Sequence, residues 1–369
     1  MIDCITRQSI YMSKKDRRIL IAGHEIGGQM QLLAETFRKR WLQASSSAYN
    51  EDFRGYQNDI MLAGKGWKAN LDRFLFFLWA LKHYHVFHFF WGVSLWSWWR
   101  FHLLDLPLLK LFGKKIVVHF RGLDVVDITY FDYLREKNRG ESVSKPPLSR
   151  PDQQKRLRKW LRYADLVLVS EPDLFAVVPQ ATLSPQVIDM AYWTPTRKPL
   201  SDQDGIIRIV HAPSSRRKKG TDFIEQAIAA LKQKGYNVEL VLAEKLPHHK
   251  IRELYEISDI GIDQVLYGWH GKVSVELMAL GKPVLCYIDP DLMRYRPDLP
   301  IVNVTPATLT AELEKLIVDK DLRESIGSQS QAYAVQYHDV EKIVDDLLVR
   351  YGFTETTNVR ERIDDANMW

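Results

Sequence analysis

The sequence has 369 residues, of which 46% are hydrophobic and 26% charged, a composition typical of a globular chain long enough for two domains. Two cysteines, Cys4 and Cys286, are too few for a disulfide framework or a thiolate metal cluster, and they favour a reducing, cytoplasmic setting. The N-terminus has no apolar run of signal-peptide length, and the longest nearly uncharged aromatic run, at 89–99, is shorter than the roughly 18 residues that cross a bilayer.

The net charge of +5 is unevenly distributed along the chain. Residues 1–160 carry 27 basic and 15 acidic residues, whereas the remainder carries 24 basic and 31 acidic residues. A basic first half favours an anionic partner such as a phosphate-bearing substrate, a nucleic acid or an acidic membrane surface. Charge alone does not separate these partners from a face of scattered, solvated lysines.

Short apolar segments alternate with helical patterns in the first half. The segments that read as buried strands are 17–23, 84–90, 114–120 and 164–170. A glycine loop follows the first of them and precedes a segment with helical spacing. This alternation predicts a doubly wound parallel sheet in residues 1–195.

Residues 196–206 are rich in Pro, Asp and Ser and are predicted to link two domains. The alternation then resumes, with predicted strands at 207–213, 236–244, 258–263 and 283–288. We therefore predict an α/β fold of two Rossmann-like domains, 1–195 and 207–350, that face one another across a cleft. A polar tail is expected at 351–369.

A candidate phosphate site follows the predicted strand at 258–263. Gly271 stands at the start of a predicted helix, so a ligand could approach the backbone closely. The N–H groups of Lys272 to Ser274, together with the helix dipole, would hold a phosphate. Glu276, about one turn further, could accept hydrogen bonds from ribose hydroxyls. The pattern predicts a nucleoside-diphosphate site.

Three segments of the second half, 211–231, 259–287 and 300–309, resemble the donor domain of GT-B glycosyltransferases of the large retaining family four. The resemblance extends over residues 17–350 and implies the GT-B form of the α/β fold. Glu276 and Gly271 match the family's second glutamate and its glycine. Gly268 stands where the family has its first glutamate, so the usual carboxylate contact to the donor sugar is missing from this position.

The family's other phosphate-binding pattern is an arginine followed five residues later by a lysine before glycine. Lys219 matches the lysine, whereas Ser214 stands at the arginine position, so Arg216 or Arg217 is expected to substitute. A run of basic residues is often only a solvated loop. Its place between a predicted strand and a predicted helix favours diphosphate binding here.

In the first half, the resemblance assigns the acceptor side to the loop of His24, Gly27 and Gly28. The segment 117–126 resembles the one that supplies a catalytic-centre histidine in the family. Its histidine position is occupied here by Arg121, and His119 lies two residues earlier. The predicted catalytic group is therefore His119, Arg121 and Asp124.

Three nearby histidines, His83, His85 and His88, lack an interleaved carboxylate or cysteine, and no metal site is predicted there or elsewhere. The resemblance likewise implies no bound metal and no cofactor besides the nucleotide sugar. Six of the eleven tryptophans lie between 67 and 99, among lysines and arginines. Such a segment fits an anionic membrane surface, but Phe74, Phe77, Leu78 and Leu81 have the spacing of a helix that faces a core.

These observations predict a glycosyltransferase that moves a sugar from a nucleotide sugar to a hydroxyl of a cell-surface glycan or polyprenyl-linked acceptor, with retention implied by the resemblance. We expect a cytoplasmic protein at the inner face of the membrane. Two alternatives stay open: a catalytically silent partner that binds nucleotide sugar or glycan, and a sugar-nucleotide 2-epimerase. Nucleic-acid binding fits less well, because the aromatic residues cluster with long aliphatic ones and form no stacking platform.

Overall fold

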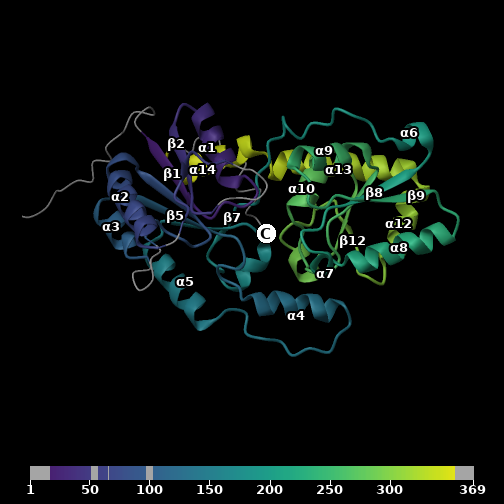
Figure 1. Ribbon diagram of the computed structural model, residues 1–369, viewed down its shortest axis with the longest axis horizontal. Coiled ribbons are helices and arrows are strands. Elements are labelled where there is room, and N and C mark those ends of the chain that lie inside the picture. Colours follow the sequence, from purple (N-terminus) through teal and green to yellow (C-terminus); the bar gives the residue numbers. More distant parts are fainter. Residues whose placement is uncertain (1–16, 51–56, 65, 97–102, 354–369) are drawn as a thin grey trace, which may run out of the picture.

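The computed structural model describes residues 17–50, 57–64, 66–96 and 103–353. Cys4, Trp98, Trp99 and the tail from residue 354 onward lie outside these ranges. Within them the chain forms two parallel sheets that lie side by side, each with helices on both faces (Figure 1).

The first half contains a seven-stranded parallel sheet in the order β3-β2-β1-β4-β5-β6-β7. Its strands are β1 (Arg18–Gly23), β2 (Gln43–Ala48), β3 (Ile60–Met61), β4 (Val86–Phe90), β5 (Lys115–Phe120), β6 (Leu166–Val169) and β7 (Thr182–Leu183). The four segments predicted as strands are the adjacent strands β1, β4, β5 and β6. They consist mainly of apolar residues because a parallel sheet is covered on both faces.

Helices cover the two faces of this sheet unequally. They are α1 (Gln29–Lys39), α2 (Trp67–His83), α3 (Asp105–Leu111), α4 (Ile128–Asn138) and α5 (Pro151–Tyr163). One face packs against α2, α3 and α5, whose buried residues include Phe77, Leu109 and Trp160. The other face packs against α1 through Met30 and Phe37.

The second half contains a five-stranded parallel sheet in the order β12-β11-β10-β8-β9. Its strands are β8 (Ile207–His211), β9 (Val238–Leu242), β10 (Ile260–Ile262), β11 (Val284–Cys286) and β12 (Val302–Asn303). Its helices are α7 (Arg216–Lys219), α8 (Thr221–Gln233), α9 (His248–Ile257), α10 (Lys272–Ala279), α11 (Pro290–Met293), α12 (Leu309–Val318) and α13 (Lys320–Tyr337). The expected linker at 196–206 contains one short helix, α6 (Ser201–Asp204).

The helix α14 (Val340–Arg350) returns to the first half. Val344 and Leu347 of this helix belong to the same buried cluster as Ile21 of β1 and Phe37 of α1. The range 207–350 predicted for the second domain therefore includes a helix that packs on the first. An amphipathic pattern shows that a helix buries one face, but it does not show which sheet that face covers.

The helix α4 also joins the halves, because it extends from the first half along the second (Figure 1). Asn138 donates to the Leu266 carbonyl at 2.8 Å, and the Arg139 guanidinium lies 2.7 Å from the Asp222 carboxylate. These contacts and the return of α14 fix the loops of the two sheets against each other.

Candidate functional site

A partly buried ion pair lies where β10 and α7 end. Lys219 is the last residue of α7 and Asp263 directly follows β10, and their Nζ and Oδ1 atoms are 2.7 Å apart. The other carboxylate oxygen accepts from the Gly271 N–H at 2.6 Å and from the Ser274 hydroxyl at 2.8 Å. Burial opposes ionisation of Asp263, but Lys219 and these donors hold its pKa below the usual value. Asp263 thus fixes the lysine against the first turn of α10.

Lys272, the first residue of α10, connects the two halves. Its Nζ donates to the Gly27 carbonyl at 2.5 Å and lies 3.4 Å from Glu276 Oε1. The buried Glu276 side chain also contacts His248 Nε2 at 3.0 Å. The structure therefore gathers five predicted donor-site residues around the start of α10: Lys219, Gly271, Lys272, Ser274 and Glu276.

Arg216 and Arg217 are not part of this group. The Arg216 guanidinium lies 3.0 Å from both Glu244 and Glu225, and Arg217 lies 3.6 Å from Glu136 of α4. The reason is geometric, because α7 is a single turn and successive side chains on a helix point about 100° apart. Only Lys219 of this run reaches Asp263, whereas the substitution of Arg216 or Arg217 for the family's arginine stays a prediction.

The glycine loop before α1 contains a carboxylate of its own. Gly27 and Gly28 have φ values of 69° and 75°, a left-handed conformation that favours glycine. The buried Glu25 side chain accepts hydrogen bonds from the N–H groups of residues 29–31 at 2.8 to 3.3 Å. The first amides of α1 are therefore already bonded to a carboxyl group of the protein. His24, also predicted for the acceptor side, contacts Asn50 at 3.4 Å.

Arg121 and Asp124 form the loop after β5. Asp124 accepts from the Arg121 N–H at 3.1 Å and from the Gly122 N–H at 2.8 Å, which folds the loop, and burial raises its pKa to about 6. The Arg121 guanidinium lies 5.5 Å from the centre of the Phe90 ring. Burial lowers the pKa of Arg121, whereas the charge of Glu171 opposes this decrease. The Asp124 side chain thus binds the backbone of this loop and positions Arg121.

His119, the other predicted catalytic residue, is 2% exposed and belongs to the core. Its Nε2 lies 2.9 Å from the Ser184 carbonyl, and its ring stacks on His88 with centroids 5.6 Å apart. Burial and the nearby Arg121 hold the pKa of His119 well below the usual value, so the ring is neutral. His119 is therefore a buried, neutral side chain of β5 that contacts Ser184 and His88.

The three histidines considered for a metal go to different partners. His83 contacts the Trp79 carbonyl at 2.7 Å, His85 accepts from the Arg18 N–H at 3.3 Å, and His88 contacts the Tyr351 hydroxyl at 2.7 Å. The part of the chain that the structure describes holds no group of His, Cys, Asp and Glu side chains arranged to bind a metal.

Two carboxyl groups outside the predicted site, those of Glu171 and Asp173, follow β6. Burial, and then the neighbouring Asp173, raise the pKa of Glu171 to about 8, against the charges of Arg121 and Lys219. Burial raises the pKa of Asp173 to about 6, and its side chain accepts from the Tyr267 hydroxyl at 3.1 Å. Glu171 thus lies near one cation from each half of the molecule. The sequence does contain a signal for Glu171, because a polar residue directly after a parallel strand lies at the edge of the sheet where ligands bind.

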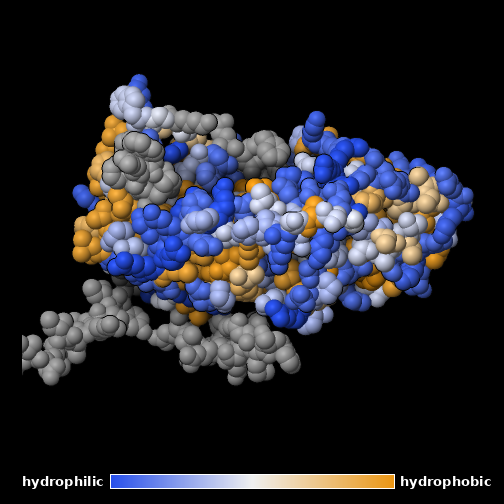
Figure 2. All heavy atoms as spheres, turned by 90° about the horizontal axis from the view of Figure 1, so that it is seen from below, coloured by the Kyte–Doolittle hydropathy of each residue, from blue (hydrophilic) through white to orange (hydrophobic). Residues whose placement is uncertain are grey.

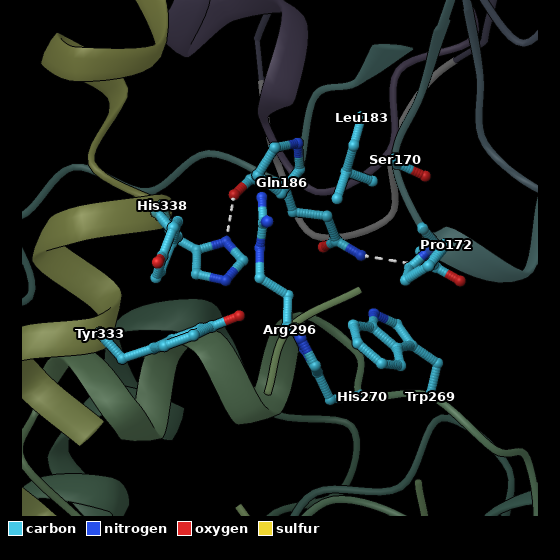
Figure 3. Close-up of a pocket in the computed structure, with 12 residues that line it drawn as sticks. Ser170, Pro172, Leu183, Gln186, Trp269, His270, Arg296, Tyr333 and His338 are labelled. Carbon is cyan, nitrogen blue, oxygen red and sulfur yellow. Dashed lines mark hydrogen bonds between the residues drawn. The ribbon is translucent and has the colours of Figure 1, made fainter. Parts of the chain in front are cut away.

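A cavity lies between the halves beside Glu171 (Figure 3). The first half lines it with residues 170–172, Leu183, Pro185 and Gln186. The second half lines it with Trp269, His270, Arg296 and residues at the end of α13. The residues around the start of α10 and the residues of this cavity are therefore adjacent through Trp269, His270 and Gly271.

No protein-family model and no curated protein matches the sequence. Solved structures match nearly the whole chain. Sucrose-phosphate synthase from Thermosynechococcus elongatus has a TM-score of 0.63 and 15% identity over 91% of this chain and 98% of that one. An alpha-glucosyltransferase in complex with UDP-glucose and DNA has a TM-score of 0.54 and 12% identity over 90% and 98%.

WaaG, a glycosyltransferase involved in lipopolysaccharide biosynthesis, has a TM-score of 0.52 and 13% identity over 90% of this chain and 100% of that one. Identities this low show the fold and do not establish membership of family four. The predicted fold class is confirmed: the chain has the α/β fold of the GT-B glycosyltransferases.

Proposed function

We propose that this chain is a glycosyltransferase that moves a sugar from a nucleoside-diphosphate sugar to a hydroxyl of a cell-surface glycan or lipid-linked oligosaccharide, with retention of configuration. The observation that carries the proposal is the placement of Lys219 and Lys272 at the start of α10, one held by Asp263 and the other bonded to the first half at Gly27. Two cations at a helix N-terminus that faces a second domain form a site suited to a diphosphate.

The leaving group explains why cations are needed there. When the bond between the anomeric carbon and the phosphate oxygen breaks, negative charge develops on the nucleoside diphosphate, and Lys219 and Lys272 stabilise it. Glu276 would accept hydrogen bonds from the ribose hydroxyls. Because these side chains supply the positive charge, we expect activity to persist in EDTA.

On the acceptor side, Arg121 and Glu171 would approach the reacting sugar. A new bond forms between the anomeric carbon and the acceptor oxygen, and the leaving phosphate oxygen takes the proton of the acceptor hydroxyl. This front-face route keeps the anomeric configuration and needs no side-chain nucleophile. NMR of the product anomer would test the retention, and an inverted anomer would contradict it.

Nucleotide binding is the first test. A thermal-shift screen with UDP, GDP and CMP should identify one base, because a ligand at 100 times its dissociation constant adds about 2.7 kcal/mol to the folded state. Titration calorimetry of the wild type and the Glu276→Gln variant should then show weaker binding in the variant. Glu312→Gln, on the exposed helix α12, is the matched control. Equal affinity in all three proteins would contradict the proposed donor site.

The two alternative functions, a sugar-nucleotide 2-epimerase and a catalytically silent partner, can be distinguished from a transferase by turnover. A 2-epimerase needs acid and base carboxyl groups, and Glu171 and Asp173 are such groups near the cleft. Incubation with the identified nucleotide sugar and no acceptor would therefore release an epimerised sugar from a 2-epimerase. A transferase would require an acceptor for turnover. Binding without turnover across a wide range of acceptors would favour the silent partner.

We also propose that the first half docks on an anionic membrane, which would bring the enzyme to a lipid-linked acceptor. On α2, Trp67, Leu71, Leu75, Leu78 and Trp79 are each at least 44% exposed, whereas Phe77 is buried. Hydrophobic side chains gather at the end of the molecule formed by α2 and α3 (Figures 1 and 2), where Lys68 and Lys82 are also exposed. None of the described helices is long and apolar enough to cross a bilayer.

Vesicle co-sedimentation tests this surface. We expect binding to anionic vesicles that salt reverses, and loss of that binding in the triple variant L71S/L75S/L78S. Val318→Ser, which changes an exposed apolar residue of the second half, should bind like the wild type. Equal binding to neutral vesicles would contradict the proposed electrostatic contribution to membrane binding.

A further inference from the structure

The helix α4 begins in the first half and ends against the second (Figure 1). Its N-cap residue Asp127 accepts from the Thr129 N–H at 2.8 Å, and the Phe131 ring is buried in the core of the first half. The 11 residues of this helix therefore project from a fixed base. The first half thus sets the position of the far end of the helix, which carries Asn138 and Arg139.

Arg139, the C-cap residue of α4, binds three groups of the second half at once. Its guanidinium lies 2.7 and 3.0 Å from the two carboxylate oxygens of Asp222, and it donates to the Arg217 carbonyl at 2.7 Å. The same guanidinium lies 5.1 Å from the centre of the Phe223 ring. Only 14% of the Arg139 side chain is exposed. Because both carboxylate oxygens are bound, the pair fixes the direction of the contact as well as its distance.

Asn138 binds a second segment of the same half. Its side-chain amide donates to the Leu266 carbonyl at 2.8 Å. Leu266 lies between the end of β10 and the start of α10, whereas the groups bound by Arg139 lie in α7 and α8, on either side of Lys219. We call these two sets of contacts the α4 clamp. The clamp therefore binds both segments that supply the candidate donor site.

The two clamped segments are in tight contact with each other. The Val265 N–H donates to the Lys219 carbonyl at 3.2 Å. A Cβ at Gly220, whose φ is 77°, would lie 2.4 Å from Val265 Cγ2, far inside the contact distance of two carbon atoms. Because no space separates the segments, the distance from Lys219 to the start of α10 depends on how firmly the segments are held together.

The α4 clamp differs in kind from the packing of α14. The helix α14 buries apolar side chains in the core of the first half, whereas the clamp consists of polar contacts near the surface, and the Asp222 side chain is 46% exposed. Polar contacts near the surface open more readily than a buried apolar face. The clamp can therefore open and close while α14 keeps the two halves joined.

We propose that Arg139, together with Asn138, is a positioning residue of the donor site: the α4 clamp holds the turn from α7 to α8 against the segment after β10, and so keeps Lys219 beside the first turn of α10. The inference rests on the proposed function, because the site that the clamp positions is the proposed nucleotide site. It adds that a helix of the first half controls the affinity of a site whose binding groups belong to the second.

Hydrogen exchange of the full chain without nucleotide tests the clamp directly. Arg139→Gln should speed exchange about tenfold in residues 215–223, and Asn138→Ala should do so in residues 264–272, because each variant loses its own contact. The matched control is Lys137→Gln, which changes an exposed residue of the same helix and should exchange like the wild type. Unchanged exchange in both segments would overturn the proposal, and so would exchange that rises by the same factor throughout the chain.

Titration calorimetry tests the effect on the donor site, with whichever of UDP, GDP and CMP binds in the thermal-shift screen. Arg139→Gln should weaken binding about tenfold, because a smaller fraction of the molecules has the binding arrangement. Asp222→Asn should weaken binding through the same contact, so the double variant R139Q/D222N should lose no more affinity than Arg139→Gln alone. Losses that add in the double variant would overturn the positioning role.

The two measurements separate this inference from the proposed function. If none of the three nucleotides binds to the wild type, the proposed function fails, and the exchange rates still decide whether α4 clamps the two segments. If nucleotide binds equally to the wild type and to Arg139→Gln while the exchange rates differ, the proposed donor site stands. In that case Arg139 has only a structural role, and the positioning role is overturned.

Discussion

The loops before α1 and α10 have the same plan but opposite electrostatics. Each follows a buried parallel strand, contains glycine, and places a carboxylate at the start of a helix. In the first loop Glu25 accepts hydrogen bonds from three backbone N–H groups. In the second loop Asp263 takes one backbone N–H and one hydroxyl and is paired with Lys219.

The difference shows that a glycine before a helix does not by itself make an anion site. A helix start whose amides are bonded to an internal carboxylate has lost the partial positive charge that a phosphate would use. At α10 the internal carboxylate instead orients a cation, and Lys272 adds a second one. The decisive feature is therefore which other side chains the strand ends bring to the glycine.

The largest effect should follow from removing the cation of the second loop. Lys219→Ala should weaken nucleotide binding on the order of 100-fold, because a charge-assisted hydrogen bond is lost. It should also destabilise the fold by about 3 kcal/mol, because Asp263 is left buried and unpaired. Calorimetry and urea unfolding measure the two effects.

The double variant K219M/D263N separates these effects. It removes the buried charge together with its partner, so the stability should return while nucleotide affinity stays low. Recovery of nucleotide affinity with stability would show that Lys219 acts only through folding.

Removing the carboxylate of the first loop should lower the stability of the fold and leave nucleotide affinity unchanged. Glu25→Ala leaves three N–H groups at the start of α1 without their acceptor and should cost about 2 kcal/mol of unfolding free energy. Nucleotide affinity should not change. Glu35→Ala, on the exposed side of α1, controls for loss of a glutamate from the same helix. A large loss of nucleotide affinity in Glu25→Ala alone would mean that the first loop does contact the donor.

Lowering the pH should change the contributions of Asp263 and Glu25 to the stability of the fold in opposite directions. The folded-state pKa of Asp263 is lowered, so its contribution to stability is present above the unfolded pKa and is lost as the pH falls through the folded value. Burial raises the pKa of Glu25, so its contribution is present at low pH and is lost as the pH rises through its folded pKa.

Urea unfolding between about pH 6 and about pH 3 can distinguish these two pH-dependent contributions. The stability advantage of the wild type over Asp263→Asn should shrink as the pH falls, whereas its advantage over Glu25→Gln should grow. Parallel curves for the two variants would contradict the assignment of opposite pKa shifts.

The smallest effect is expected for the exposed arginines of α7. Arg216→Gln and Arg217→Gln should leave nucleotide affinity within about twofold of the wild type, because both arginine side chains are exposed and pair with acidic residues of α4, α8 and the segment after β9. A tenfold loss in either variant would show that the arginine turns toward the ligand when nucleotide is bound.

The order of strands and helices could be predicted from the sequence because buried parallel strands are short, apolar and β-branched. The packing of α14 on the first sheet could not be predicted, since the pattern of Val340, Val344 and Leu347 defines a buried face but not its partner. The strands β2, β3, β7 and β12 are not among the predicted strands either. The sequence of β2, with three serines at 45–47, lacks the apolar run that marks the central strands.

The candidate site could be predicted in part. Lys219, Gly271 and Glu276 were found because they stand at the ends of predicted elements and match a known pattern. The sequence pattern predicts Asp263 only as the last residue of a strand, and it gives no role to Glu171, one residue beyond another predicted strand. Arg216 could not be separated from Lys219, because direction within a single helical turn depends on the tertiary contacts of Glu244 and Asp263.

The return of α14 has a consequence for synthesis. Because this helix follows both sheets in the sequence, the core around Ile21 and Phe37 stays uncovered on the ribosome until residues beyond 340 have emerged. The half that is made first is therefore the half that is finished last. A nascent chain halted before Val340 would present an apolar sheet face to chaperones, even though its second sheet is already complete.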